Sequence, residues 1–187
     1  MTATNTAAAL ALIASIAACN TTSSKPTPAE RGKYLVTAAG CNDCHTPLIM
    51  GPKGPERDAN HVLAGHPASM ALPPAPAAQG PWMYTAAATM TAWSGPWGVS
   101  FTANLTPDKE TGLGTWDAQT FIATLRNARH MGKGRPLLPP MPAEMIAQYT
   151  DEDLTAIFAY LQSLPPVKNR VPDPIPPTVA TAAVPSS

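Results

Sequence analysis

The sequence predicts a single all-α domain, because it contains two well-marked amphipathic helices and no strand pattern. The clearest helix begins after Thr150, and its apolar residues recur at the spacing of one helical face. These residues are Leu154, Ile157, Phe158, Leu161 and Leu164. The other helix begins after Thr27, where Pro28 and Glu30 complete an N-terminal capping pattern. No stretch shows the sustained apolar and polar alternation of a half-buried strand.

The remaining helical signals complete this all-α prediction. The first helix stops at Gly40, and Gly32 lies in its interior, where glycine costs about 1 kcal/mol relative to alanine. We expect Gly32 to permit a close crossing by the last helix, which ends before Pro165. A third helix is predicted to begin near Asp117 and a short fourth to cover 142–149. The third helix has an apolar stripe formed by Ala118, Phe121, Ile122, Leu125 and Ala128.

The proline distribution divides the chain into a domain and its flanking segments. The chain has 23 prolines, many of them in a long loop over 46–103 and in the last part of the sequence. We predict a domain over 28–166 that contains this loop as an insertion, a polar tether over 19–27, and a disordered proline-rich tail over 167–187.

The N-terminal residues predict export. Residues 1–18 resemble a signal peptide of the lipoprotein type, with an apolar run too short to span a bilayer. The run ends in a sequence similar to the bacterial lipobox, in which Cys19 becomes the lipidated first residue. The start of the leader departs from the usual pattern because it lacks Lys and Arg. We expect a periplasmic protein anchored to the membrane through Cys19; the alternative is a soluble periplasmic protein in which this cysteine is incidental.

A C-x-x-C-H motif formed by Cys41, Cys44 and His45 predicts the covalent attachment of one c-type haem. The two thiols add to the porphyrin and the imidazole binds the iron. The alternatives are a zinc site, for which the sequence lacks a second ligand pair, and a redox pair, for which it lacks a βαβ pattern. We expect a backbone carbonyl of the following loop to accept the imidazole N–H, near one of three prolines: Pro47, Pro52 or Pro55.

Met141 is the candidate for the second axial ligand, because prolines surround it and stiffen its backbone. These prolines are Pro139, Pro140 and Pro142. A thioether binds iron weakly and therefore needs such positioning. Met131 and Met145 lie on predicted helices and are interpreted as packing residues. Three histidines compete as distal ligands, but we interpret them as surface or turn residues: His61, His66 and His130.

Charge and composition exclude several function classes. Twelve Lys and Arg balance twelve Asp and Glu, so no overall charge favours nucleic acid as a partner. One basic cluster is a candidate docking ring for a redox partner, or equally a solvated helix face: Arg126, Arg129, His130, Lys133 and Arg135. The sequence shows no Ser-His-Asp arrangement, glycine-rich phosphate loop or pair of catalytic carboxylates.

Taken in order, the motifs resemble the class I cytochrome c domain. The matching segments are 31–35 with 41–45, 103–108, 111–116, 139–142 and 151–157. The resemblance implies a class I cytochrome c fold in which the first and last helices cross, with His45 and Met141 as axial ligands. It also implies that Trp116 lies near the haem propionates, and Arg135 is a second candidate for that position. The subtype is similar to the cytochrome subunits of periplasmic dehydrogenases of alcohols and sugar acids.

These expectations favour an electron carrier over an enzyme. Iron with two protein ligands has no vacant position for substrate, and methionine opposite histidine raises the reduction potential. The expected partners are a dehydrogenase as electron donor or a terminal oxidase as acceptor. Two alternatives remain: a haem enzyme, peroxidase-like or acting on a small inorganic substrate, whose distal ligand is displaced; and a haem sensor or adaptor that recruits a partner through its tail.

Overall fold

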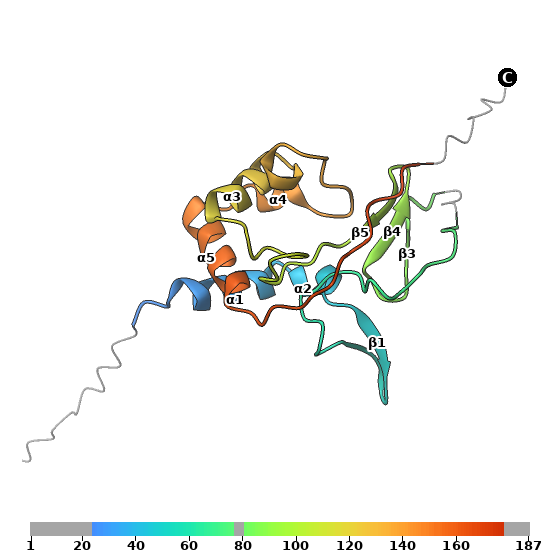
Figure 1. Ribbon diagram of the computed structural model, residues 1–187, viewed down its shortest axis with the longest axis horizontal. Helices are drawn as coiled ribbons and strands as arrows, with labels where there is room; N and C mark the ends of the chain where they lie inside the picture. The colour runs from blue at the N-terminus through green and yellow to red at the C-terminus, as the bar shows by residue number, and fades with distance from the viewer. Residues whose placement is uncertain (1–23, 77–80, 178–187) are drawn as a thin grey trace, which may run out of the picture.

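A computed structural model of the chain describes residues 24–76 and 81–177 (Figure 1). The described helices are α1 (Pro28–Ala38), α2 (Cys41–His45), α3 (Ala118–Arg126), the 3-10 turn η1 (His130–Gly132), α4 (Ala143–Ile146) and α5 (Asp151–Gln162). The described strands are β1 (Leu48–Gly51), β2 (Gly54–Arg57), β3 (Thr85–Ala86), β4 (Ala92–Gly95) and β5 (Gly98–Phe101). No helix within these described ranges is long and apolar enough to cross a membrane.

Helices α1 and α5 cross closely at one end of the molecule, as predicted (Figure 1). Thr27 and Glu30 form the predicted capping box at the start of α1, and the Thr150 side chain caps α5. A Cβ atom on Gly32 would overlap the carbonyl of Ala156 in α5. Glycine is therefore required at the crossing point, which explains its place inside a helix.

The hydrophobic core is assembled mainly from the faces of α1, α3 and α5. Helix α3 begins after Asp117, whose carboxylate accepts a hydrogen bond from the backbone N–H of Thr120. Helix α4 is shorter than the predicted 142–149. The buried members of the core are Leu35, Val36, Leu63, Leu113, Phe121, Ile122, Leu125, Ile146, Leu154, Ala156, Ile157 and Leu161.

The prediction of an all-α domain is wrong, because the loop over 46–103 contains two antiparallel sheets. One is the β1–β2 hairpin, which projects from the body of the molecule, and the other has the strand order β3-β4-β5 (Figure 1). These strands are only two to four residues long, so none is long enough to show sustained alternation. Their turns are Gly-Pro-Lys-Gly and Gly-Pro-Trp-Gly, and such Gly and Pro residues are as typical of irregular loops as of hairpins.

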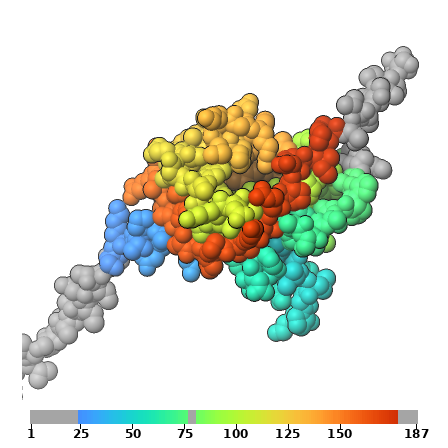
Figure 2. Space-filling model, viewed as in Figure 1, coloured from blue at the N-terminus to red at the C-terminus, as the bar shows by residue number. Residues whose placement is uncertain are grey.

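Residues 167–177, which we expected within a disordered tail, lie against the domain surface (Figure 2). The Asn169 side chain donates to the carbonyls of Ala64 and His66, at 2.7 and 2.9 Å, and accepts from the backbone N–H of Ala68 at 2.8 Å. Farther along, Ile175 pairs with Val99 of β5. This segment therefore forms specific hydrogen bonds with the loop and with β5, although it forms no helix. The predicted leader, Cys19 and the tail beyond 177 lie outside the described residues.

Candidate haem site

The C-x-x-C-H motif forms the short helix α2, which lies between the α1–α5 crossing and the β3–β4–β5 sheet (Figure 1). Gly40 precedes it in a left-handed conformation, with φ 68°, and turns the chain directly out of α1. Because Cys41 and Cys44 are three positions apart on one helical turn, their side chains lie on the same side of α2. The helix therefore presents both thiols on one side, and His45 follows directly in the same helix.

The cysteines do not have the properties of a redox pair. Burial raises the pKa of the Cys41 thiol to about 11, and burial also raises the pKa of Cys44. Reactive C-x-x-C pairs instead have lowered pKa values, because the thiolate is the attacking species. Within the described part of the chain, no three His, Cys, Asp or Glu side chains come together as a metal site. The raised pKa values of the two thiols thus do not favour the redox alternative.

His45 is buried, and its ring is oriented by a distant backbone carbonyl. Its Nδ1 donates a hydrogen bond to the carbonyl oxygen of Ala103, at 2.8 Å. This tautomer leaves the lone pair of Nε2 for a metal ion. Burial lowers the pKa of His45, which favours the neutral, metal-binding form of the imidazole. The carbonyl belongs to the last residue of the inserted loop, so the expectation that Pro47, Pro52 or Pro55 marks it is wrong.

Gly65 allows the carbonyl of Ala103 to reach His45. The backbone N–H of Gly65 donates to the carbonyl of His45 at 2.8 Å. Its φ is 77°, and a Cβ atom there would overlap the backbone of Thr102 and Ala103. On either side, Leu105 N–H donates to the carbonyl of Leu63, and His66 N–H to that of Thr102. The segment 63–66 thus holds both His45 and its carbonyl partner in place.

Met141 is partly buried against the hydrophobic core, on the loop between η1 and α4. The Ser100 hydroxyl of β5 donates to the carbonyl of Pro139, at 2.6 Å. Ser100 is also buried, with 7% of its surface exposed. Strand β5 and the residues after it therefore contact both candidate ligand segments, through Ser100 on the Met141 loop and Ala103 on His45.

The structure contains two unpartnered donors that suit an acidic cofactor. The indole nitrogens of Trp93 in β4 and Trp97 in the β4–β5 turn are buried and have no hydrogen-bond partner among the described residues. Buried polar groups in proteins are nearly always paired. A haem would bring two carboxylates into this domain, so these donors, the two thiols and the Nε2 of His45 together fit that group.

The structure also places the other predicted residues. Trp116 is partly buried at the core, and its ring meets that of His130 edge to face, with centroids 5.4 Å apart. Arg135 is exposed. The packing role predicted for Met131 and Met145 is wrong, because 48% and 50% of their surfaces are exposed. In the basic cluster, Arg126 pairs with Asp151 at 2.6 Å and so joins α3 to α5.

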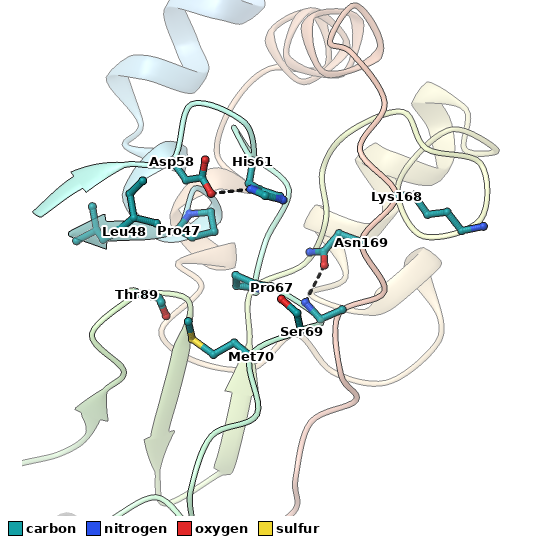
Figure 3. A pocket seen from close by; sticks show the side chains of 12 residues that line it. Pro47, Leu48, Asp58, His61, Pro67, Ser69, Met70, Thr89, Lys168 and Asn169 are labelled. Carbon is teal, nitrogen blue, oxygen red and sulfur yellow. Dashed lines mark hydrogen bonds and ion pairs between the residues drawn. The ribbon is translucent and has the colours of Figure 1, made fainter. Parts of the chain in front are cut away.

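Two of the competing histidines are engaged elsewhere. His61 Nδ1 lies 2.6 Å from the carboxylate of Asp58, beside a cavity of about 340 Å³ that the C-terminal segment helps to line (Figure 3). His66 is fully buried, contrary to its interpretation as a surface or turn residue. Its Nδ1 contacts the Thr91 hydroxyl at 2.9 Å and its Nε2 the carbonyl of Met70 at 3.2 Å. Both ring nitrogens of His66 are therefore occupied.

Sequence reasoning missed Gly65, Ser100 and Ala103, which support the candidate ligands. It also missed the unpartnered donors of Trp93 and Trp97. Only the glycines on either side of Pro96-Trp97 give a signal, because such residues between short β-rich runs are typical of a hairpin turn.

Comparison with known proteins identifies one family model and several similar dehydrogenase subunits. The family model described as Cytochrome c matches residues 29–165. The fructose dehydrogenase cytochrome subunit of Gluconobacter japonicus is 29% identical, over 74% of this chain and 23% of its own length. The gluconate 2-dehydrogenase cytochrome c subunit of Pantoea cypripedii is also 29% identical, over 70% of this chain and 22% of its own length. A nicotinate dehydrogenase subunit from Pseudomonas putida is 29% identical over 76% of this chain and 9% of its own length. The chain thus spans less than a quarter of each relative.

Proposed function

The chain belongs to the cytochrome c family, and from this premise we propose how its haem is held and which proteins it serves. The protein carries electrons by means of a covalently bound haem c. In the proposal, Cys41 and Cys44 supply the two thioether attachments. His45 Nε2 and Met141 Sδ bind the iron. When bound, the haem supplies one electron at a time by exchange between the ferrous and ferric states.

The observation that carries this proposal is the hydrogen bond from His45 Nδ1 to the carbonyl of Ala103. It fixes the ring orientation and the tautomer, and it increases the basicity of Nε2. The bond from Ser100 of β5 to Pro139 restrains the Met141 loop from a position three residues before Ala103. Ligand segments restrained in this way move little when the oxidation state changes. Small movement favours rapid electron transfer, and retained ligands exclude substrate from the iron.

We infer that the electron donor is a dehydrogenase, since the similar proteins are named as dehydrogenase subunits. The acceptor in this proposal is a second redox protein of the periplasm or membrane. Trp116 and Arg135 remain candidates for contact with the haem propionates, and the basic cluster remains a candidate docking ring.

We also propose that Cys19 is lipidated and holds the protein on the outer side of a bacterial membrane. Several acyl chains anchor a protein stably, whereas a single chain does so only weakly. The Cys19→Ser variant should therefore appear in the soluble fraction while the unmodified chain sediments with membranes. Recovery of the unmodified chain as soluble protein with an N-terminus beyond Cys19 would contradict this part of the proposal.

The ligand assignment is tested by Met141→Ala in the haem-loaded protein, with Met145→Ala as the matched control. Removal of Met141 should abolish the charge-transfer band between sulfur and ferric iron, lower the reduction potential and admit cyanide. Met145 is half exposed on α4, so its variant should keep the band and the potential. If the unaltered protein already binds cyanide rapidly at low concentration and turns over peroxide, the carrier assignment fails in favour of a haem enzyme.

A further inference from the structure

We infer that the inserted β-hairpin forms the propionate-binding part of the haem site, with the indole N–H of Trp93 as its main donor and that of Trp97 as its second. This inference rests on the proposed haem site and adds residues that the resemblance to the cytochrome c family does not identify. It starts from the two buried indole nitrogens that lack a partner.

Strand pairing places these indoles on one face of the hairpin. Trp93 of β4 stands directly opposite Ser100 of β5, and opposite residues in an antiparallel pair point to the same face. Gly95 lies two residues after Trp93 and shares that face. A Cβ atom on Gly95 would overlap the six-membered ring of Trp97, so the Trp97 ring lies over Gly95. Trp93, Trp97 and Ser100 therefore occupy the same face.

That face is directed toward the candidate distal ligand. The Ser100 hydroxyl reaches the carbonyl of Pro139, two residues before Met141. Three residues after Ser100, Ala103 accepts the hydrogen bond from His45. Three residues of extended chain cover about 10 Å. The two indoles therefore lie beside the strand that links the two candidate ligand segments.

The chemistry of the indoles suits a carboxylate. An indole N–H can donate a hydrogen bond but cannot accept one. It therefore stabilises an ionised carboxylate and cannot pair with another donor. Trp93 has only 7% of its surface exposed, so its donor is largely shielded from bulk water. Tyr84 packs against both rings, with centroids 5.6 Å from Trp93 and 6.2 Å from Trp97, and helps to hold them. Hydrogen bonds to charged groups are stronger than neutral ones, which offsets the cost of burying these donors.

The test is the pH dependence of the reduction potential in haem-loaded wild type and Trp93→Phe. Protonation of a propionate removes a negative charge near the iron, so the potential rises as pH falls through the propionate pKa. Loss of the indole donor destabilises the ionised propionate. We expect the rise to begin about one pH unit higher in Trp93→Phe, a tenfold change in the protonation constant, and a smaller shift in Trp97→Phe. Trp82→Phe is the matched control, because 74% of Trp82 is exposed, and it should titrate like wild type.

A second measurement on the wild-type protein does not depend on how the variants fold. The ¹⁵N–¹H resonance of the Trp93 indole should shift with the same propionate titration. The inference is overturned if this resonance does not titrate, if Trp93→Phe titrates like wild type, or if Trp116→Phe moves the titration and Trp93→Phe does not. Acid extraction and the sulfur-to-iron band, recorded on the same samples, report haem attachment and Met141 ligation separately. Failure of the proposed haem site is thus distinguishable from failure of the Trp93 assignment.

Discussion

The contact between β5 and the Met141 loop predicts that Ser100→Ala weakens the hold of the distal ligand on iron. In the structure the Ser100 hydroxyl donates to the carbonyl of Pro139 at 2.6 Å, and the serine is buried. Removing the hydroxyl loses one hydrogen bond and leaves the carbonyl of Pro139 less well solvated. The state in which Met141 is held in place should therefore be destabilised by about 1.5 kcal/mol. In the proposed haem site, cyanide must displace Met141 before it binds, so an easier displacement tightens the apparent affinity for cyanide. The apparent dissociation constant for cyanide should therefore fall about tenfold.

The assay for this prediction is a cyanide titration of the ferric, haem-loaded protein, together with the intensity of the sulfur-to-iron band. Ser94→Ala is the control, because Ser94 lies one residue from Trp93 in β4 and therefore points to the opposite face of the hairpin. It should bind cyanide as wild type does. Equal cyanide affinity in Ser100→Ala and wild type would refute the view that β5 restrains the distal ligand.

Three further predictions concern attachment and stability. Cys41→Ala combined with Cys44→Ala should allow acid acetone to extract any haem that the variant holds, whereas haem should stay on the wild-type polypeptide. Gly32→Ala gains about 1 kcal/mol of helix propensity but forces α1 away from α5, so it should lower the free energy of unfolding by about 2 kcal/mol in a denaturant titration. Asn169→Ala removes three hydrogen bonds between the C-terminal segment and the loop, and should lower the free energy of unfolding by about 3 kcal/mol. The control Asn60→Ala, at an exposed turn, should leave the free energy of unfolding unchanged.

Local signals predicted the helical part of the fold and the chemistry of α2. The capping box at Thr27, the acidic first turn of α5 and the glycine in α1 each act within a few residues or through one crossing, so sequence spacing is sufficient to find them. The C-x-x-C-H motif is likewise contiguous. The capping residues and the motif can be recognised because each depends on only one turn of helix.

The inserted loop could not be predicted in the same way, because its structure depends on contacts between distant residues. The carbonyl that orients His45 comes from Ala103, 58 positions away, and any residue type supplies the same backbone group. Four-residue strands carry too little periodicity to be distinguished from irregular chain. In the C-terminal segment, the side chain of Asn169 bonds to backbone groups about a hundred positions earlier in the sequence. Nothing in the composition of a proline-rich tail indicates that contact.

The position of the insertion explains why this domain can differ from a simple helical bundle while retaining its haem chemistry. The chain leaves His45 and forms a hairpin and a three-stranded sheet. It then bonds to the Met141 loop through Ser100 of β5 and to His45 through Ala103, two residues after β5. Ile175 then pairs with β5 at Val99, so the C-terminal segment restrains the same strand. A mutation that loosens β5 should therefore affect both proposed axial ligands together, whereas one at Met50 in the projecting β1–β2 hairpin, where 80% of the surface is exposed, should affect neither.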